Sequence, residues 1–507
     1  MRRLVAVAML VALVAACEGG DGDDAPTEGG VLRVAGQGMS TLDPAQAVGP
    51  ASATIADLVF DTVVEYSAEN RRAEPLLATE WEVSENQRRF TFTLAEDATF
   101  HDGSPLTAAD VKASWERVVA PATESPAAGL LEPVEGFVAA RDGGGALSGV
   151  RAPDDTTLVV ELARPQSDFV LNLTHPALGV LRDGRMRPRQ EPVGSGPFAI
   201  DQVEPDRVVL RAADGHDALL DGIELIDRER SGQVTRALES NDADTALLPG
   251  TSAAPDQTTV TAGDYLAVGY YALNLRNPKL ADERFRAAII LAIDPTAAVE
   301  TGYRDAARPA EGIVPSVAAG ADQDACDERC GPDHGRAERL LREVFGDAPP
   351  PTIFLDHDDT PLQQRVAQDL ARQLQEVGIP AELRAHAVGE YDDFLVNGEP
   401  DLFRFGWVGD VPAARDFLTP VFVPDAPENV IGVQAGGLVD GLARAAESPD
   451  AERRSAAYAD AQAAVLDEWC VVPLAQFTTR FVTTEGVRGM NVTPFGSFDG
   501  TAVWIEQ

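Results

Sequence analysis

Apolar and polar positions alternate in short runs through the first half of the chain, between a few segments of helical period. This alternation predicts strands at residues 31–35, 90–94, 157–162 and 207–211. Apolar residues at helical spacing predict a helix over 55–66. Thr107 to Asp110 resembles a capping box, which would begin a second helix that continues to about Val119. A loop-rich insertion is expected at 121–149.

The second half of the chain alternates more clearly between strands and helices. Strands are predicted at 270–275, 352–355, 381–385 and 402–407, and helices at 283–293, 362–377 and 451–469. The strand at 352–355, the helix at 362–377 and the strand at 381–385 read as a βαβ unit, so those two strands should be parallel. The pattern as a whole therefore predicts an α/β fold.

The N-terminus has the pattern of a secretory signal peptide over residues 1–16. Three residues with two arginines precede an apolar run that is well short of the ~20 residues a membrane-spanning helix needs. Small residues stand directly before Cys17, in a string that resembles a bacterial lipobox, so we expect Cys17 to be lipidated. An incidental cysteine after an ordinary signal peptide is the alternative. Residues 17–30 are almost without apolar side chains and should form a flexible tether.

Length and charge narrow the classes of function. The 507 residues exceed one typical core, which implies at least two domains after the leader. A formal net charge of −41 would repel nucleic acid and anionic headgroups. We therefore expect no nucleic-acid partner, and contact with a membrane only through the N-terminal lipid.

Cysteine usage fits an oxidising exterior. Cys326 and Cys330 lie four residues apart and can close a small disulfide loop worth about 2 kcal/mol. A metal site there would need more ligands than His334, the nearest histidine, supplies. Cys470 stands in an apolar run, so we expect it to be buried and reduced.

Signatures of catalysis are scarce, which predicts a protein that is not an enzyme and uses no cofactor or metal. Gly194-Ser195-Gly196 lacks the spacing of a nucleophile elbow. Gly36-Gln37-Gly38 lacks the third glycine of a dinucleotide-binding fingerprint. Asp356-His357-Asp358-Asp359 could in principle hold a cation, but in so acidic a chain it reads better as a solvated loop.

Several segments resemble one family of proteins, the dipeptide, oligopeptide and nickel branch (family 5) of the extracytoplasmic solute-binding proteins that serve ABC importers. The matching segments are 41–44, 74–118, 193–198, 274–294 and 406–410, of which the block around FHDGSPLTAADV is the most specific. The resemblance implies the two-lobed type II periplasmic-binding-protein fold, with an extra subdomain in the N-terminal lobe. Carried onto this chain, lobe I takes 31–55, 190–268 and 476–507, the subdomain 56–189, and lobe II 269–475.

The resemblance also implies a way of working. A ligand is gripped between the lobes when a hinge closes, and the importer recognises the closed form. The partners implied are a short peptide or similar small solute and the permease and ATPase subunits of an importer. A monomer anchored by its lipid to the outer face of a bacterial cell membrane is expected.

Candidate ligand-binding residues follow from matching positions. In peptide-binding members the aspartate of the G-W-x-x-D pattern accepts hydrogen bonds from the ligand's α-ammonium, and Gly406 to Asp410 matches that pattern. Trp407 would wall a side-chain pocket, with core packing as the alternative. Arg365 resembles the arginine that holds the ligand carboxylate, although an arginine on a helix is most often simply solvated.

Three further candidates are Thr41, in the first matching segment, and the pair Tyr270 and Tyr271. Strand alternation should place one of the two tyrosines inward and the other toward the cleft.

One departure keeps other ligands open. Peptide binders commonly follow the aspartate with a polar stretch containing proline and aspartate, whereas residues 411–416 read Val-Pro-Ala-Ala-Arg-Asp. A non-peptide solute such as an oligosaccharide, an opine or a metal chelate is therefore an alternative, although scarce histidine makes nickel a weaker one. A surface sensor or hydrolase on the same fold is a further alternative.

Overall fold

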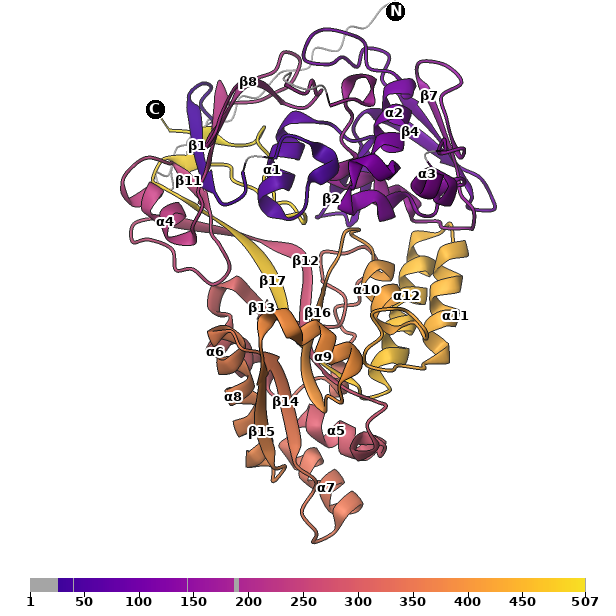
Figure 1. Ribbon diagram of the computed structural model, residues 1–507, viewed down its shortest axis with the longest axis vertical. Coiled ribbons are helices and arrows are strands. Elements are labelled where there is room, and N and C mark those ends of the chain that lie inside the picture. The colour runs from indigo at the N-terminus through magenta and orange to yellow at the C-terminus, as the bar shows by residue number, and fades with distance from the viewer. Residues whose placement is uncertain (1–25, 40, 144, 187–190, 507) are drawn as a thin grey trace, which may run out of the picture.

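The computed structural model describes residues 26–39, 41–143, 145–186 and 191–506. Two lobes are joined by a pair of long strands, β12 (Thr259–Leu273) and β17 (Val471–Thr483), which cross the middle of the molecule (Figure 1). The mixed α/β fold with two lobes agrees with the expectation from the sequence. The predicted signal peptide, Cys17 and most of the predicted tether lie outside the described residues.

One sheet of eleven strands runs through both lobes. From lobe II to lobe I the strands follow the order β15-β14-β16-β12-β17-β11-β1-β10-β9-β8, and β13 also pairs with β17. Their bounds are β1 Val31–Gly36, β8 Phe198–Glu204, β9 Arg207–Ala212, β10 Gly222–Asp227, β11 Thr245–Leu247, β13 Ala307–Pro309, β14 Ile353–Asp358, β15 Ala381–His386 and β16 Leu402–Val408. The lobe boundaries expected at 268 and 476 fall within β12 and β17, so these strands belong to both lobes.

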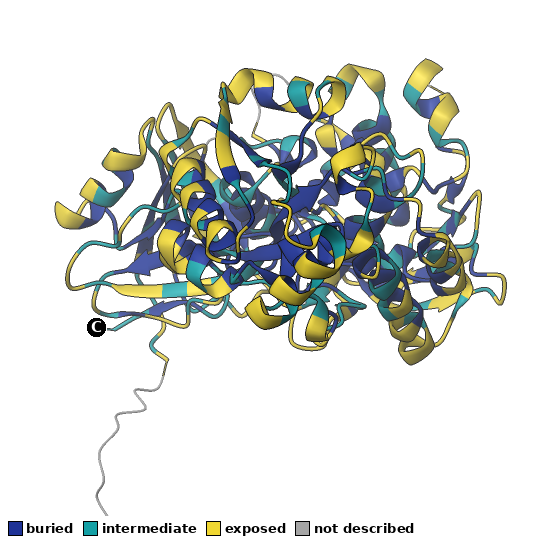
Figure 2. Ribbon diagram, turned by 90° about the horizontal axis from the view of Figure 1, so that it is seen from below, coloured by how far each residue is buried: buried dark blue, intermediate teal, exposed yellow. Residues whose placement is uncertain are grey.

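Helices cover the sheet in both lobes. Lobe I carries α1 Pro50–Val59 and α4 Ser231–Glu239, and lobe II carries α5 Glu283–Leu291, α6 Pro295–Gly302, α7 His334–Phe345, α8 Pro361–Glu376, α9 Tyr391–Asn397, α10 Ala414–Phe422, α11 Gly436–Glu447 and α12 Ala451–Leu466. Figure 2 shows the buried residues gathered at the centre, with the helices turning exposed faces outward. None of the helices in the described part of the chain is long and apolar enough to cross a membrane.

The βαβ unit predicted in lobe II is present. β14 and β15 pair in parallel, with Ile353 opposite Ala381, and α8 connects them. Thr360 caps α8 by accepting the backbone N–H of Gln363, as a threonine before a first-turn proline commonly does.

The subdomain has its own antiparallel sheet in the order β4-β5-β7-β6, beside the hairpin β2-β3. Its elements are β2 Val64–Ser67, β3 Arg72–Pro75, β4 Ala78–Val83, β5 Arg89–Leu94, α2 Ala108–Val119, α3 Phe137–Gly143, β6 Val150–Arg151 and β7 Thr157–Glu161. The predicted capping box begins α2, where the backbone N–H of Thr107 donates to Asp110 at 2.9 Å. Trp115 of α2 is fully buried with Phe90 and Phe92 of β5.

Short 3-10 helices and a small two-stranded sheet complete the fold. The 3-10 helices are η1 Pro44–Gln46, η2 Pro121–Thr123, η3 Pro126–Leu131, η4 Phe169–Thr174, η5 Pro176–Leu178, η6 Arg182–Gly184, η7 Pro278–Leu280, η8 Arg304–Ala306, η9 Asp327–Arg329 and η10 Val388–Glu390, and the strands are β18 Val487–Arg488 and β19 Trp504–Ile505.

The helix predicted over 55–66 is wrong in its bounds. α1 begins five residues earlier, at Pro50, and ends at Val59. Strand β2 begins at Val64, inside the range that was predicted to be helical. Every residue from Phe60 to Val64 is buried. The helical spacing of apolar residues therefore did not show where the helix ends, because the apolar pattern continues into the buried segment that follows it.

Candidate ligand-binding site

A cavity of about 610 Å³ lies between the two lobes, beside the strands that join them. Lobe I contributes Gln37, Val48, Gly49, Pro50, Ala51, Leu247, Leu248, Pro249, Gly250 and Thr251; lobe II contributes Tyr303, Ala306, Leu362, Arg404 and Val408; and the joining strands contribute Tyr265, Ala267, Phe477, Thr478 and Thr479. Ligand pockets commonly occupy ~300–1,000 Å³ and sit between domains. The cavity is therefore suited to a small ligand held by both lobes.

Strand β16 carries Arg404, a charged residue that lines the cavity. It pairs antiparallel with β12, with Tyr271 opposite Arg404 and Ala267 opposite Val408. Because side chains alternate along a strand, Arg404 and Val408 lie on the same face, and both line the cavity. The pairing continues past the strand end, where the N–H of Gly409 donates to the carbonyl of Leu266 at 2.7 Å.

Asp410 follows directly, next to the cavity. It stands two residues after Val408, which lines the cavity. Burial, and after it the negative charge of Asp410, raise the pKa of Tyr265, another cavity residue. Among the described residues, the Asp410 carboxylate makes no hydrogen bond or ion pair. Although the residue is exposed overall, desolvation by the surrounding chain raises the pKa of its carboxyl. A cation that reached Asp410 would therefore supply a missing partner.

Asp416, on the first turn of α10, holds the Asp410 loop in place. Its Oδ2 accepts the backbone N–H of Asp410 at 2.8 Å and that of Val411 at 3.1 Å. Burial raises the pKa of Asp416 to about 6, against the opposing effect of Arg415. A Cβ added at Gly409 would lie 2.9 Å from Asp416 Oδ2, so this close approach needs glycine.

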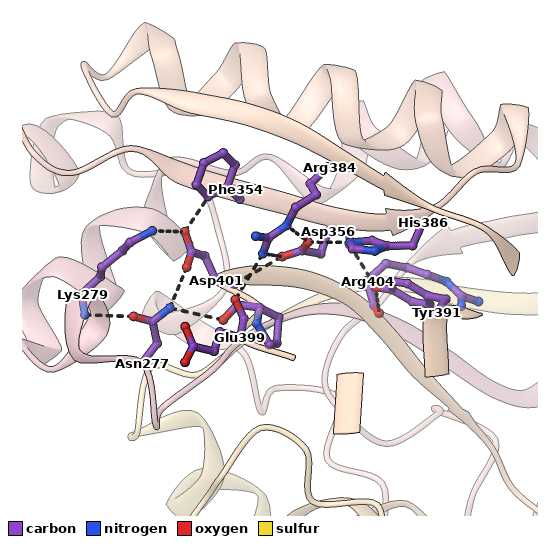
Figure 3. A network of polar contacts seen from close by, with 11 residues as sticks. Asn277, Lys279, Phe354, Asp356, Arg384, His386, Tyr391, Glu399, Asp401 and Arg404 are labelled. Carbon is purple, nitrogen blue, oxygen red and sulfur yellow. Dashed lines mark hydrogen bonds and ion pairs between the residues drawn. The ribbon is translucent and has the colours of Figure 1, made fainter. Parts of the chain in front are cut away.

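Arg404 is a site residue that the sequence reasoning missed. Its guanidinium reaches the carboxylate of Asp358 at 3.5 Å. The hydroxyl of Tyr391 donates to the backbone carbonyl of Arg404 at 2.7 Å (Figure 3). The side chain remains 38% exposed, so it can still meet a ligand. Strand alternation was the available signal, because Arg404 stands an even number of residues before Asp410.

The acidic segment of residues 356–359 was predicted to be a solvated loop, and this is wrong for most of it. Asp356, His357 and Asp358 are buried at the end of β14, and Asp356 is fully inaccessible. Asp356 pairs with Arg384 and His386 of β15, at 2.8 and 2.9 Å (Figure 3). The neighbouring strand β15 thus brings the compensating guanidinium of Arg384 and a hydrogen-bonding imidazole, which the local sequence does not reveal. In the described part of the chain no group of three or more His, Cys, Asp or Glu is placed to hold a metal ion.

The expectation that one of the two adjacent tyrosines faces the cleft is also wrong. Tyr270 is 1% exposed and Tyr271 is inaccessible. Tyr270 packs against Phe405 and Phe422, with ring centroids 5.9 and 6.0 Å apart, while Tyr271 enters the core on the opposite face. β12 lies inside the sheet with helices over both faces, so alternation directs both tyrosines into the protein.

The other candidates lie outside the cavity lining in this structure. Trp407 lies on the opposite face of β16 from Arg404 and packs beside the core that contains Phe403. Arg365 is exposed on α8, one turn beyond the cavity residue Leu362. Thr41 is partly buried in the loop after β1. The structure thus brings only Asp410 of the predicted residues to the edge of the cavity.

A disulfide joins Cys326 and Cys330. Cys470 is a free, buried cysteine, and burial raises the pKa of its thiol to about 12. A thiol that stays protonated is a poor nucleophile, so Cys470 is unsuited to chemistry.

Comparison with known proteins identifies the family. The model of the bacterial extracellular solute-binding proteins, family 5 Middle, matches residues 72–429. The chain belongs to this family. Among its family 5 relatives, the probable di/tripeptide-binding protein 5 of Pseudomonas aeruginosa is 27% identical, over 89% of this chain and 91% of that protein. The probable deoxycholate-binding periplasmic protein YgiS of Escherichia coli is also 27% identical, over 86% and 85%.

Solved structures share the fold. The unliganded open form of the periplasmic murein tripeptide-binding protein MppA superposes with a TM-score of 0.82 at 23% identity, over 95% of this chain and 98% of that one. A DppA from Helicobacter pylori, in complex with the peptide STSA, superposes with a TM-score of 0.67 at 21% identity, over 95% and 99%.

Proposed function

We propose that this family 5 protein captures short peptides outside the cytoplasm, in the cavity between its lobes, and presents them to an ABC importer. The observation that carries the proposal is a pair of opposite charges beside that cavity, one on β16 and the other two residues after the end of that strand. Asp410 is an anion without a partner among the described residues, and Arg404 is a cation that lines the cavity. A peptide with free termini carries the complementary charges at its two ends.

The ligand would work by favouring the closed arrangement of the lobes. Only a ligand that contacts both lobes has a higher affinity for the closed state, and this cavity has walls from both. This chain superposes on the unliganded open form of MppA with a TM-score of 0.82, and on the DppA–peptide complex with a TM-score of 0.67. The better match to the open form supports an arrangement in which the two lobes of this protein stand apart. Capture would need no chemical step, in keeping with a family of solute-binding proteins.

The spacing of the two charges supports a limit on peptide length. A strand rises about 3.3 Å per residue, so the Cα atoms of Arg404 and Asp410 are at most about 20 Å apart. An extended peptide spans about 3.5 Å per residue, which allows about six residues between the two charges. Side chains that lean toward each other shorten this span, so peptides of two to five residues fit best.

Transport and anchoring complete the proposal. The permease and ATPase subunits of an importer would receive the peptide from the closed protein, which would act as a monomer. Lipidation of Cys17 would hold it at the outer face of the cell membrane, with residues 17–30 as a tether. The lipobox-like string before Cys17 and the weakly apolar segment after it support this arrangement.

Calorimetry with peptides of two to eight residues tests the proposal. Free peptides of two to five residues should bind, and N-acetylated copies should lose most of their affinity. Asp410→Asn should weaken binding by about 2–5 kcal/mol, because the ammonium would then be buried without a counter-charge. Asp440→Asn, an exposed aspartate on α11, is the matched control and should bind normally. Equal binding of free and acetylated peptides would contradict the assignment.

A non-peptide amphipathic solute is a second candidate. Val48, Leu362 and Val408 give the cavity apolar walls, and one relative is named as probably binding deoxycholate. A steroid-like carboxylate would need Arg404 but no ammonium site. Binding that Arg404→Met abolishes and Asp410→Asn leaves unchanged would favour this candidate over a peptide.

A further inference from the structure

We infer that the interlobe cavity selects peptides with apolar side chains, because it offers apolar surface from both lobes and no charge to pair with a charged side chain. The inference rests on the proposed peptide function and names the substrate class within it.

Two exposed valines face the cavity from opposite lobes. Val48 of lobe I is 64% exposed and Val408 of lobe II is 57% exposed, and both line the cavity. Large apolar side chains gathered at one exposed hollow commonly mark a binding surface. Leu248, Leu362 and Phe477 extend the same apolar lining. Closure around an apolar side chain would remove all of this surface from water, which favours binding in proportion to the area buried.

The charges of the cavity are confined to the groups that would bind the termini. Arg404 is the one charged residue in the lining, as far as the described residues show, and Asp410 stands at its edge. A ligand carboxylate or ammonium in the side-chain region would lose its water on closure and gain no partner.

The lining of the interlobe cavity contains no carboxylate among the described residues. Acidic residues line a separate hollow of about 390 Å³, to which Asp57, Asp61, Glu65 and Asp499 contribute. The net charge of −41 thus contributes no acidic side chain to the lining of the interlobe cavity, as far as the structure describes it. Cationic side chains gain no counter-charge in its lining.

A series of peptides that differ in one central side chain tests the inference. Calorimetry would compare Leu-Leu-Leu, Leu-Ser-Leu, Leu-Asp-Leu and Leu-Lys-Leu, all with free termini. The dissociation constants of the Asp and Lys peptides should be at least thirtyfold higher than that of Leu-Leu-Leu, with the Ser peptide between them.

A variant of the lining should weaken the binding of one peptide and strengthen that of another, an opposite effect on two ligands that misfolding cannot produce. Val408→Lys should weaken Leu-Leu-Leu at least tenfold and improve Leu-Asp-Leu, because the new ammonium pairs with the ligand carboxylate. Val439→Ser, at an exposed valine on α11, is the control and should change neither constant. Melting of each unliganded variant checks folding.

The outcomes separate this inference from the proposed function. If all four peptides bind within threefold of one another, the cavity is indifferent to side chains and the inference is overturned, while the peptide function stands. If no peptide of any kind binds the wild-type protein, the proposed function fails and the inference falls with it.

Discussion

Arg415 should stabilise the contact between the subdomain and lobe II through a buried ion pair. Its Nε donates to Asp168 Oδ1 at 2.9 Å, and the hydroxyl of Tyr458 donates to Asp168 Oδ2 at 2.6 Å. Asp168 begins η4 of the subdomain and is 2% exposed, whereas Arg415 and Tyr458 belong to α10 and α12 of lobe II. We predict that Arg415→Met lowers the free energy of unfolding substantially.

The magnitude follows from the burial of Asp168. Removing the guanidinium leaves a buried carboxylate with Tyr458 as its remaining side-chain donor, a change that costs about 3–5 kcal/mol. Unfolding entropy of about 2.1 cal/mol/K per residue gives about 1 kcal/mol/K for this chain, so the melting temperature should fall by about 3–5 °C. Replacing both partners, in Arg415→Met with Asp168→Leu, should recover most of the loss because no buried charge remains.

Urea denaturation and calorimetry would measure these changes on the full mature protein. Arg453→Met is the matched control, since Arg453 is exposed on α12, and it should change the free energy of unfolding by less than about 0.5 kcal/mol. A cost below about 1 kcal/mol for Arg415→Met would refute the reasoning. So would a double variant that loses as much as the two single variants together, because the two residues would then act independently.

Three further predictions concern pH, the disulfide and the anchor. Burial raises the pKa of Asp61 to about 7, against the opposing effect of Ser195, so the native state binds this proton more tightly than the unfolded state. The contribution of Asp61 to the free energy of unfolding should therefore fall as pH rises from about 4 to 7. In urea titrations at pH 5 and 8, Asp61→Asn should remove about 2–3 kcal/mol of the loss between these two pH values, and an unchanged pH dependence would count against this. In a chain carrying Cys17→Ala, alkylation under denaturing conditions without reductant should modify only Cys470, and after reduction it should also modify Cys326 and Cys330. Intact mass counts the modified thiols, and three modified thiols before reduction would exclude the disulfide. Cys17→Ala should also release the protein from cell membranes with an unchanged unfolding midpoint, and equal membrane association of the variant would contradict lipid anchoring.

Local sequence predicted the elements whose signals are themselves local. The capping box at Thr107 predicted the start of α2, and the strand–helix–strand pattern predicted the parallel pair β14 and β15. The segments shared with family 5 supplied the two-lobed architecture, which composition and periodicity alone could not. The bounds of α1 were misjudged where a fully buried stretch hides the helical period, and the strand predicted at 270–275 is the end of β12, which begins at Thr259.

Tertiary structure alone decided which side chains meet at the cavity. Alternation says that Tyr270 and Tyr271 point to opposite faces, but whether a face is covered depends on helices far away in the sequence. Arg404 is a site residue because β16 lies beside β12, and the burial of Asp356 is possible because β15 brings the guanidinium of Arg384 to it. Local sequence patterns specify the backbone conformation of a few neighbouring residues, whereas burial and charge pairing depend on contacts between distant segments. The sequence by itself therefore determined the secondary-structure elements, and the tertiary structure determined the site.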